Sequence, residues 1–148
     1  ISARGAQMRP TTPKQGSDNM GKPILCLDFD GVIHSYESGW KGADKIPDPP
    51  VPGALAFIAE AVNHFDVYVF SSRSNQSGGR FAMQAWLRGH MCAAYQGDGH
   101  DIVDEIKWPD AKPPAMVTID DRALTFDGTW PAIDTLKAFQ PWNKRVPT

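Results

Sequence analysis

The sequence predicts an α/β domain with a mostly parallel sheet, because short apolar runs alternate with segments of helical periodicity. The chain has 148 residues, of which 41% are hydrophobic and 22% are charged, enough for one packed core. Three apolar runs each end in polar side chains, and the carboxyl ends of parallel strands share one edge of a sheet. We therefore expect a single domain with its functional site at that edge.

The charges are nearly balanced, with 15 Lys and Arg against 17 Asp and Glu, so no overall field attracts nucleic acid or an anionic membrane. Two cysteines, Cys26 and Cys92, are too few for a disulfide framework and indicate reduced thiols in a cytoplasmic protein. No stretch approaches the roughly 18 to 20 apolar residues that span a bilayer, so we expect no membrane association. Nothing in the sequence indicates an obligate protein partner.

Residues 1–22 are rich in Gly, Pro, Ser, Thr and charge, and they predict a disordered tail or an expression remnant ahead of a domain over 23–148. The apolar run 24–27 is typical of a strand buried on both faces. Asp28 and Asp30 follow it directly, at the carboxyl end of the expected strand.

Residues 35–52 form a Gly- and Pro-rich connection that is longer than usual, which favours a functional loop with Trp40 at its middle. Apolar spacings of three and four predict a helix over 53–65, and residues 66–72 predict a second buried strand.

The second half of the chain predicts three more elements. A helical pattern covers about 80–88, with Gly89 as its stop, and a third strand covers 116–119. Asp120 and Asp121 end that strand, and a last helix is expected over 131–139.

Four carboxylates would meet at the sheet edge, those of Asp28, Asp30, Asp120 and Asp121, and they would repel one another unless a cation lay between them. Oxygen ligands alone favour Mg²⁺, and the lack of a Cys/His cluster argues against zinc. An EF-hand is excluded, because counting Asp28 as its first position places Gly39 where the bidentate Glu belongs.

Three segments resemble motifs of the haloacid dehalogenase (HAD) superfamily. Residues 27–33, Leu-Asp-Phe-Asp-Gly-Val-Ile, resemble motif I, residues 70–73 resemble motif II, and residues 119–123 resemble motif IV. The matches follow the order of the family. The resemblance implies a Rossmann-like, three-layer α/β/α fold with a flap but without a large cap domain.

By this resemblance, Asp28 would be a nucleophile that forms an aspartyl-phosphate, and Asp30 would be the general acid/base. Mg²⁺ would be held by Asp28, the backbone carbonyl of Asp30, Asp120 and Asp121. The second aspartate of motif I is linked in the family to phosphoryl chemistry rather than dehalogenation.

The resemblance also assigns substrate phosphate to Ser71, Ser72 and the charged Arg73. The family needs a motif III lysine, for which Lys112 is preferred because Lys-Pro-Pro-Ala follows the family pattern. Lys107 remains an alternative, because a strand over 116–119 spans roughly 13 Å and could leave Lys112 at its wrong end.

A substrate flap is expected around His34, Tyr36, Trp40 and Lys41, whose aromatic and charged side chains suit a nucleotide base and a phosphate. The alternative is that the aromatic rings pack the loop onto its own domain. Without a large cap the site would admit bulky substrates.

The resulting hypothesis is a Mg²⁺-dependent phosphomonoester hydrolase acting on a small molecule, a nucleotide or a nucleic-acid end. Two alternatives remain open at this point: a phosphotransferase of the same fold, and a phosphate-binding or interaction module without turnover. The sequence leaves the physiological substrate and the oligomeric state open.

Overall fold

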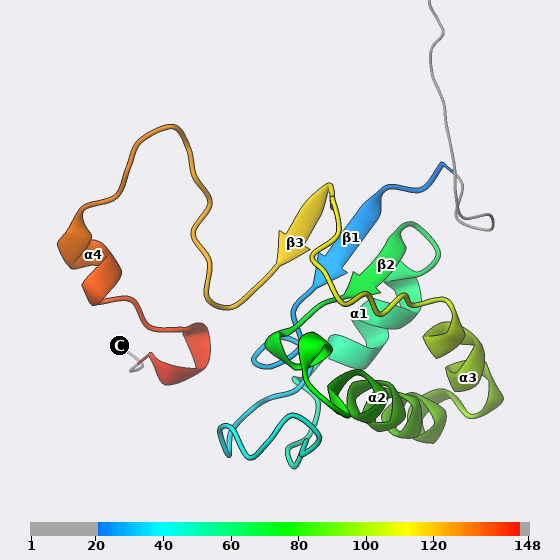
Figure 1. Cartoon of the computed structure of the whole chain (residues 1–148). Helices are drawn as coiled ribbons and strands as arrows, with labels where there is room; N and C mark the ends of the chain where they lie inside the picture. Colours follow the sequence, from blue (N-terminus) through cyan, green and yellow to red (C-terminus); the bar gives the residue numbers. More distant parts are fainter. Residues whose placement is uncertain (1–20, 146–148) are drawn as a thin grey trace, which may run out of the picture.

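The computed structural model describes residues 21–145, and it has an α/β fold around a small parallel sheet (Figure 1). The strands are β1 (Ile24–Leu27), β2 (Asp66–Val69) and β3 (Val117–Ile119), in the order β2-β1-β3. Both pairs of neighbouring strands are parallel, which confirms the predicted class and sheet type. The expected tail falls almost wholly outside the described residues.

In the described part of the chain, four α-helices and two 3₁₀ helices accompany the sheet. They are α1 (Ala54–Ala61), α2 (Gly79–Tyr95), α3 (Gly97–Asp104), α4 (Ile133–Lys137), η2 (Ser72–Asn75) and η3 (Trp142–Lys144). No helix within residues 21–145 is long and apolar enough to cross a membrane.

The strand order switches at β1, the central strand, which has β2 on one side and β3 on the other. The chain passes from β1 through α1 to β2 on one side, and it reaches β3 on the other side only after η2, α2 and α3. Before the chain reaches β3, Lys107 forms an isolated parallel bridge with β2. Its N–H donates to Val67 O and its carbonyl accepts from Val69 N–H, both at 2.9 Å. Such a switch in strand order opens a crevice at the carboxyl ends of the central strands.

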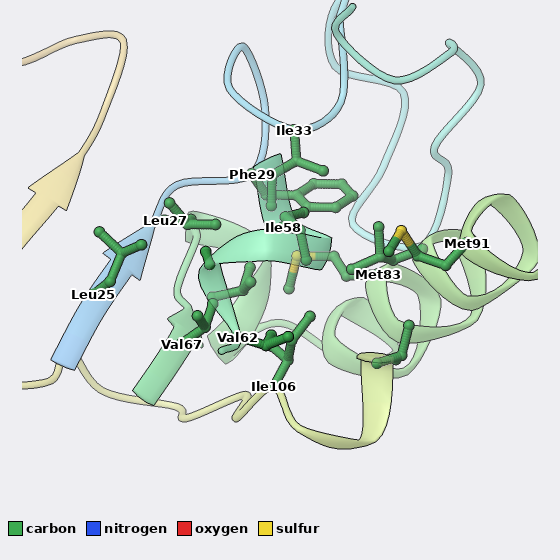
Figure 2. Packing of buried hydrophobic residues seen from close by; sticks show 14 residues of the cluster. Leu25, Leu27, Phe29, Ile33, Ile58, Val62, Val67, Met83, Met91 and Ile106 are labelled. Atoms are coloured by element: carbon green, nitrogen blue, oxygen red, sulfur yellow. The ribbon is translucent and has the colours of Figure 1, made fainter. Parts of the chain in front are cut away.

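The core lies on one face of the sheet (Figure 2). The register pairs Leu25 with Val67 and Leu27 with Val69, and alternate residues of a strand share a face. α1, α2 and α3 contribute Ile58, Met83, Leu87, Met91 and Val103 to the same cluster. Each fully buried apolar side chain of this size contributes about 1.5–3 kcal/mol relative to exposure.

The opposite face carries Cys26, which is buried although no helix in residues 21–145 covers it. Burial raises the pKa of the Cys26 thiol, and the nearby positive charge of Lys112 opposes this rise, so Lys112 lies close to this face. Residues 108–116, which cross from β2 to β3, contain prolines at 109, 113 and 114 and form no helix. Residues 21–145 therefore do not show the second helical layer that the resemblance implied.

The predicted helix stop at Gly89 is wrong, since α2 continues to Tyr95. Met83, Leu87 and Met91 recur every four residues and keep one face of α2 buried beyond the glycine. Gly89 itself is exposed, and its low helix propensity costs only about 1 kcal/mol. The same buried face leads into α3, which the sequence did not predict because polar residues and glycines dominate it.

Three other elements are shorter than expected. The helix expected over 53–65 ends at Ala61, and the strand expected over 66–72 ends at Val69, because Ser71 already caps η2. The helix expected over 131–139 covers only α4, whose five residues are all exposed.

The segment after β3 extends away from the sheet and carries α4 before it returns through η3 (Figure 1). Its return is fixed by Trp142, whose Nε1 donates to Gly31 O at 2.8 Å, and by Asn143, whose Nδ2 donates to Ser35 O at 3.4 Å. The end of the described chain therefore contacts the turn that follows β1.

Two glycines give opposite stability predictions. A Cβ on Gly99 would lie 2.5 Å from Met91 C, so Gly99→Ala forces α3 away from α2 and should lower the free energy of unfolding by about 1–3 kcal/mol. A Cβ on Gly89 meets nothing within 4 Å, so Gly89→Ala should raise the free energy of unfolding by about 0.5–1 kcal/mol. Urea unfolding measures both, and equal effects would contradict the close packing of the two helices.

Candidate functional site

The carboxyl end of β1 holds Asp28 in a fixed position. Its N–H donates to Ile119 O at 2.9 Å, which continues the pairing with β3, and its Oδ1 accepts from Phe29 N–H at 2.8 Å. The chain then turns sharply, because the N–H groups of Ile33 and His34 both donate to Phe29 O at 2.9 Å. Asp28 thus lies at the carboxyl end of the central strand, where the strand order switches.

Gly31 in this turn allows Asp121 to approach. Its φ of +83° is a conformation that L side chains rarely adopt, and a Cβ there would collide with the Asp121 carboxylate. The turn after β1 and the segment after β3 are therefore in direct contact at a position that requires glycine.

Three of the predicted carboxylates come together. Oxygens of Asp28, Asp120 and Asp121 lie within 4.8 Å of one another. The Asp121 side chain is 4% exposed, and its Oδ1 is buried without a hydrogen-bond partner in residues 21–145. An unsatisfied buried carboxylate oxygen beside two other carboxylates fits a divalent cation, because such an ion would balance the charges and fill the open ligand position.

The surroundings of Asp28 disfavour its charged form. Burial raises its pKa to about 8, Phe29 N–H opposes the rise, and the charges of Asp120 and Asp121 add to it. Without a cation, burial and the neighbouring carboxylates therefore favour the protonated form of Asp28. A cation within the cluster would favour the carboxylate.

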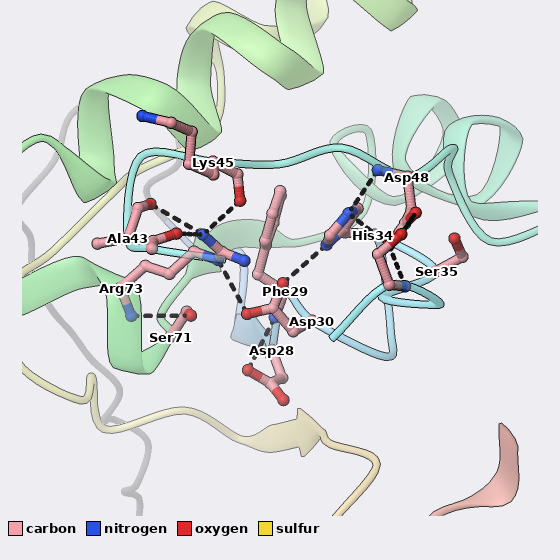
Figure 3. A network of polar contacts seen from close by, with 12 residues as sticks. Asp28, Phe29, Asp30, His34, Ser35, Ala43, Lys45, Asp48, Ser71 and Arg73 are labelled. Atoms are coloured by element: carbon pink, nitrogen blue, oxygen red, sulfur yellow. Dashed lines mark hydrogen bonds and ion pairs between the residues drawn. The ribbon is translucent and has the colours of Figure 1, made fainter. Parts of the chain in front are cut away.

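Asp30 lies in the opposite electrostatic environment (Figure 3). Its Oδ1 accepts from His34 Nδ1 at 2.8 Å, and its Oδ2 accepts from Arg73 Nε at 2.9 Å. Burial alone would raise the pKa of Asp30, but the two donors and the Arg73 charge hold it below its usual value. The Asp30 side chain is not part of the three-carboxylate cluster and is ionised.

His34 is completely buried beneath the flap, which we define as residues 35–52. Its Nε2 accepts from Asp48 N–H at 3.1 Å, so Nδ1 carries the hydrogen that is donated to Asp30, and the ring is neutral. Phe29 and Trp86 pack against the ring, with centroids 5.6 Å and 5.4 Å away. His34 therefore orients Asp30 and does not reach the surface.

Asp48 holds the flap in shape. Its carboxylate accepts from Ser38 Oγ at 2.6 Å and from Ser38 N–H at 2.7 Å, and these hydrogen bonds lower the pKa of Asp48. Tyr36 adopts a φ of 62°, which is unusual for a residue other than glycine. Trp40 and Lys41 are exposed on the flap, as a substrate contact would require.

The motif II residues are placed differently from one another. Ser71 is buried and caps η2, since its Oγ accepts from Arg73 N–H at 3.1 Å and its N–H donates to Ser74 Oγ at 3.0 Å. Ser72 is exposed. Arg73 is 0% exposed, so the structure does not present the guanidinium to a substrate phosphate.

Neither candidate lysine contacts the three-carboxylate cluster within the described chain. Lys107 Nζ donates to Asp66 Oδ1 at 2.7 Å, and Asp66 is at the amino end of β2, opposite to the end where Asp28 lies. Lys112 is exposed near Cys26, where it has no hydrogen bond within residues 21–145.

Sequence reasoning missed Asp48 and Trp142. Asp48 lies among prolines, where an aspartate is an ordinary turn residue, and Trp142 is 111 positions from the glycine it binds. Neither position carried a local signal for contact with the site.

Comparison of the chain with protein-family models, curated proteins and solved structures finds no match. The chemistry of the site is therefore argued from its own geometry. The arrangement can place a cation and a protonatable carboxyl group at one crevice, with a second, ionised carboxylate two residues further on.

The raised pKa of Asp28 predicts how stability depends on pH in the metal-free protein. The pKa rises from 3.8 to about 8 on folding, so the contribution of Asp28 is complete below pH 4 and is lost as the pH rises towards 8. Urea unfolding in EDTA at several pH values should therefore show a steeper decline for the wild type than for Asp28→Asn. Asp134→Asn, on the exposed α4, is the control and should behave like the wild type. Parallel pH profiles for the wild type and Asp28→Asn would contradict the shift.

Proposed function

We propose that this protein is a Mg²⁺-dependent phosphomonoester hydrolase that works through an aspartyl-phosphate on Asp28. The observation that carries the proposal is the grouping of Asp28 with Asp120 and Asp121 at the switch point of a parallel sheet. The unsatisfied Oδ1 of Asp121 supports a cation there. The resemblance of residues 27–33, 70–73 and 119–123 to the HAD motifs supports phosphoryl transfer.

In this proposal, Asp28, Asp120, Asp121 and the backbone carbonyl of Asp30 hold the ion. Bound Mg²⁺ would supply positive charge that stabilises the ionised Asp28 and the phosphoryl oxygens. Asp28 would then attack phosphorus and form an acyl phosphate as the bond from phosphorus to the leaving oxygen breaks, and that oxygen would take a proton from solvent water. Water attacks this intermediate in the second half of the reaction and releases inorganic phosphate.

In its ionised state, Asp30 is suited to the second half of this reaction, in which water attacks the acyl phosphate. An ionised carboxylate can take a proton from the attacking water, and the His34 hydrogen bond fixes its orientation. To protonate the leaving group first, Asp30 needs a proton that its ion pair with Arg73 disfavours. As the structure stands, the leaving oxygen would therefore take its proton from solvent water.

The exposed edge of the site suits a phosphate on a large molecule. Ser71 and the backbone around Ser72 are the proposed phosphate contacts, and Trp40 on the flap is 45% exposed. Of the two lysines, Lys112 is favoured by the resemblance alone, because Lys107 is bound to Asp66 and Met116, four residues after Lys112, pairs with Ile24 at the same amino end of the sheet. The proposed substrate class is a nucleotide or a nucleic-acid end, with Tyr36, Trp40 and Lys41 on the substrate side of the flap.

Loss of the nucleophile should abolish turnover. With Mg²⁺, the wild type should hydrolyse an aryl phosphate, and Asp28→Asn should be slower by about 10³-fold or more. Asp134→Asn is the matched control and should retain full activity. Equal activity of Asp28→Asn would refute the proposal. Transfer of phosphate to added nucleosides or sugars would identify a phosphotransferase, and absence of turnover on any phosphoester would favour a binding module.

Gly31 should be needed for cation binding independently of activity. Gly31→Ala pushes a methyl group into the Asp121 carboxylate and should weaken Mg²⁺ binding about tenfold to a hundredfold. Gly39→Ala is the control, because Gly39 has a similar φ of +76° but no atom within 4 Å of a Cβ. Isothermal titration calorimetry measures both affinities, and equal losses would show that backbone strain, not the Asp121 contact, is responsible.

A further inference from the structure

One of the connections between the flap and the interior is a buried cation. Arg73 follows β2 in η2 and is 0% exposed, although it is charged. Burying a guanidinium is costly unless its charge is paired and its N–H groups are hydrogen-bonded. Nε and Nη1 of Arg73 meet this condition, while Nη2 is buried without a hydrogen-bond partner in residues 21–145. The partners of Arg73 therefore show what it holds together.

One side of the Arg73 guanidinium faces Asp30 and the other faces the flap (Figure 3). Nε donates to Asp30 Oδ2 at 2.9 Å. Nη1 donates to three flap carbonyls, those of Gly42 and Ala43 at 2.9 Å and that of Lys45 at 3.1 Å. The Trp40 ring covers the guanidinium, with 4.7 Å between its centroid and Cζ.

The two oxygens of Asp30 lead to two different parts of the flap. Oδ2 accepts a hydrogen bond from Arg73, which in turn donates to carbonyls of residues 42–45. Oδ1 is hydrogen-bonded to His34, whose other ring nitrogen accepts from Asp48 N–H. The flap therefore cannot shift without changing the contacts of Asp30, and Asp30 cannot turn without changing those of the flap.

We propose that Arg73 is a positioning residue, which holds the flap and the Asp30 carboxylate in one fixed relation and does not bind substrate phosphate. Its effect on turnover rests on the proposed function, in which Asp30 transfers protons. Its effect on the flap does not, because the contacts with the three carbonyls exist without substrate.

Hydrogen exchange tests the connection without any need for activity. In Arg73→Ala, the amides of residues 40–46 should exchange at least about tenfold faster, equivalent to about 1.4 kcal/mol, while those of β1 and α2 stay unchanged. Arg73→Lys should give the same result, because one nitrogen cannot serve Asp30 and three carbonyls together. Arg80→Ala is the control, since Arg80 lies on the exposed start of α2 and donates to Trp108 O.

Three outcomes would overturn the proposal. The first is flap exchange in a folded Arg73→Lys that equals the wild type, which would reduce the role of Arg73 to charge balance. The second is faster exchange throughout the molecule, or loss of the native circular dichroism in both variants, which would make Arg73 a general stability residue. The third is a higher inhibition constant for inorganic phosphate with unchanged flap exchange, which would make Arg73 a phosphate ligand.

Kinetics provides the second readout once hydrolysis by the wild type is established. Arg73→Lys should lower kcat by about tenfold or more and leave KM and the phosphate inhibition constant within about twofold, because ground-state binding is not its role. If the wild type shows no hydrolysis, the proposed function fails, while the exchange experiment still decides whether Arg73 holds the flap.

Discussion

The site depends on the pairing of β1 on both of its edges. The last ladder hydrogen bonds, Phe70 N–H to Leu27 O and Asp28 N–H to Ile119 O, lie directly beside the residues that form the crevice. Because β1 is held by β2 and β3 together, its carboxyl end cannot move independently of either. The chemistry of the site is thus carried by short side chains on the most restrained part of the backbone.

Asp28 and Asp30 are two residues apart and titrate in opposite directions. Asp28 is partly desolvated beside two other carboxylates, whereas Asp30 receives hydrogen bonds from a neutral imidazole and a guanidinium. Neighbouring carboxyl groups with separated pKa values are a common basis for dividing acid, base and nucleophile roles. Here the division arises because His34 and Arg73, which are themselves hydrogen-bonded to the flap, pair with Asp30, whereas Asp28 lies beside Asp120 and Asp121.

The sequence predicted the α/β class because its strands are short apolar runs with polar ends, a pattern that burial on a parallel sheet imposes. It also predicted that Asp28, Asp120 and Asp121 lie at one edge, since each follows a strand of a parallel sheet, but it did not show that β1 and β3 are neighbours or that the Asp30 side chain lies outside the cluster. It could not predict that Arg73 points inwards, because the three carbonyls that bind it lie about 30 positions earlier and carry no side-chain signal. Within the described residues, the prolines after Lys107 keep the segment that crosses to β3 from forming a helix of a second layer. Met91 extends the buried face of α2 beyond Gly89, and this depends on what the helix packs against.

The hydrogen bond from Trp142 to Gly31 joins residues 111 positions apart. Contacts of such sequence separation close a large loop and form only after the intervening chain is ordered, so they contribute to slow folding. The turn after Asp28 therefore gains this hydrogen bond only after the 110 residues between Gly31 and Trp142 have been synthesised. During synthesis, a nascent chain that has already formed β1, β2 and the apolar core would still lack the hydrogen bond from Trp142 to the Gly31 carbonyl.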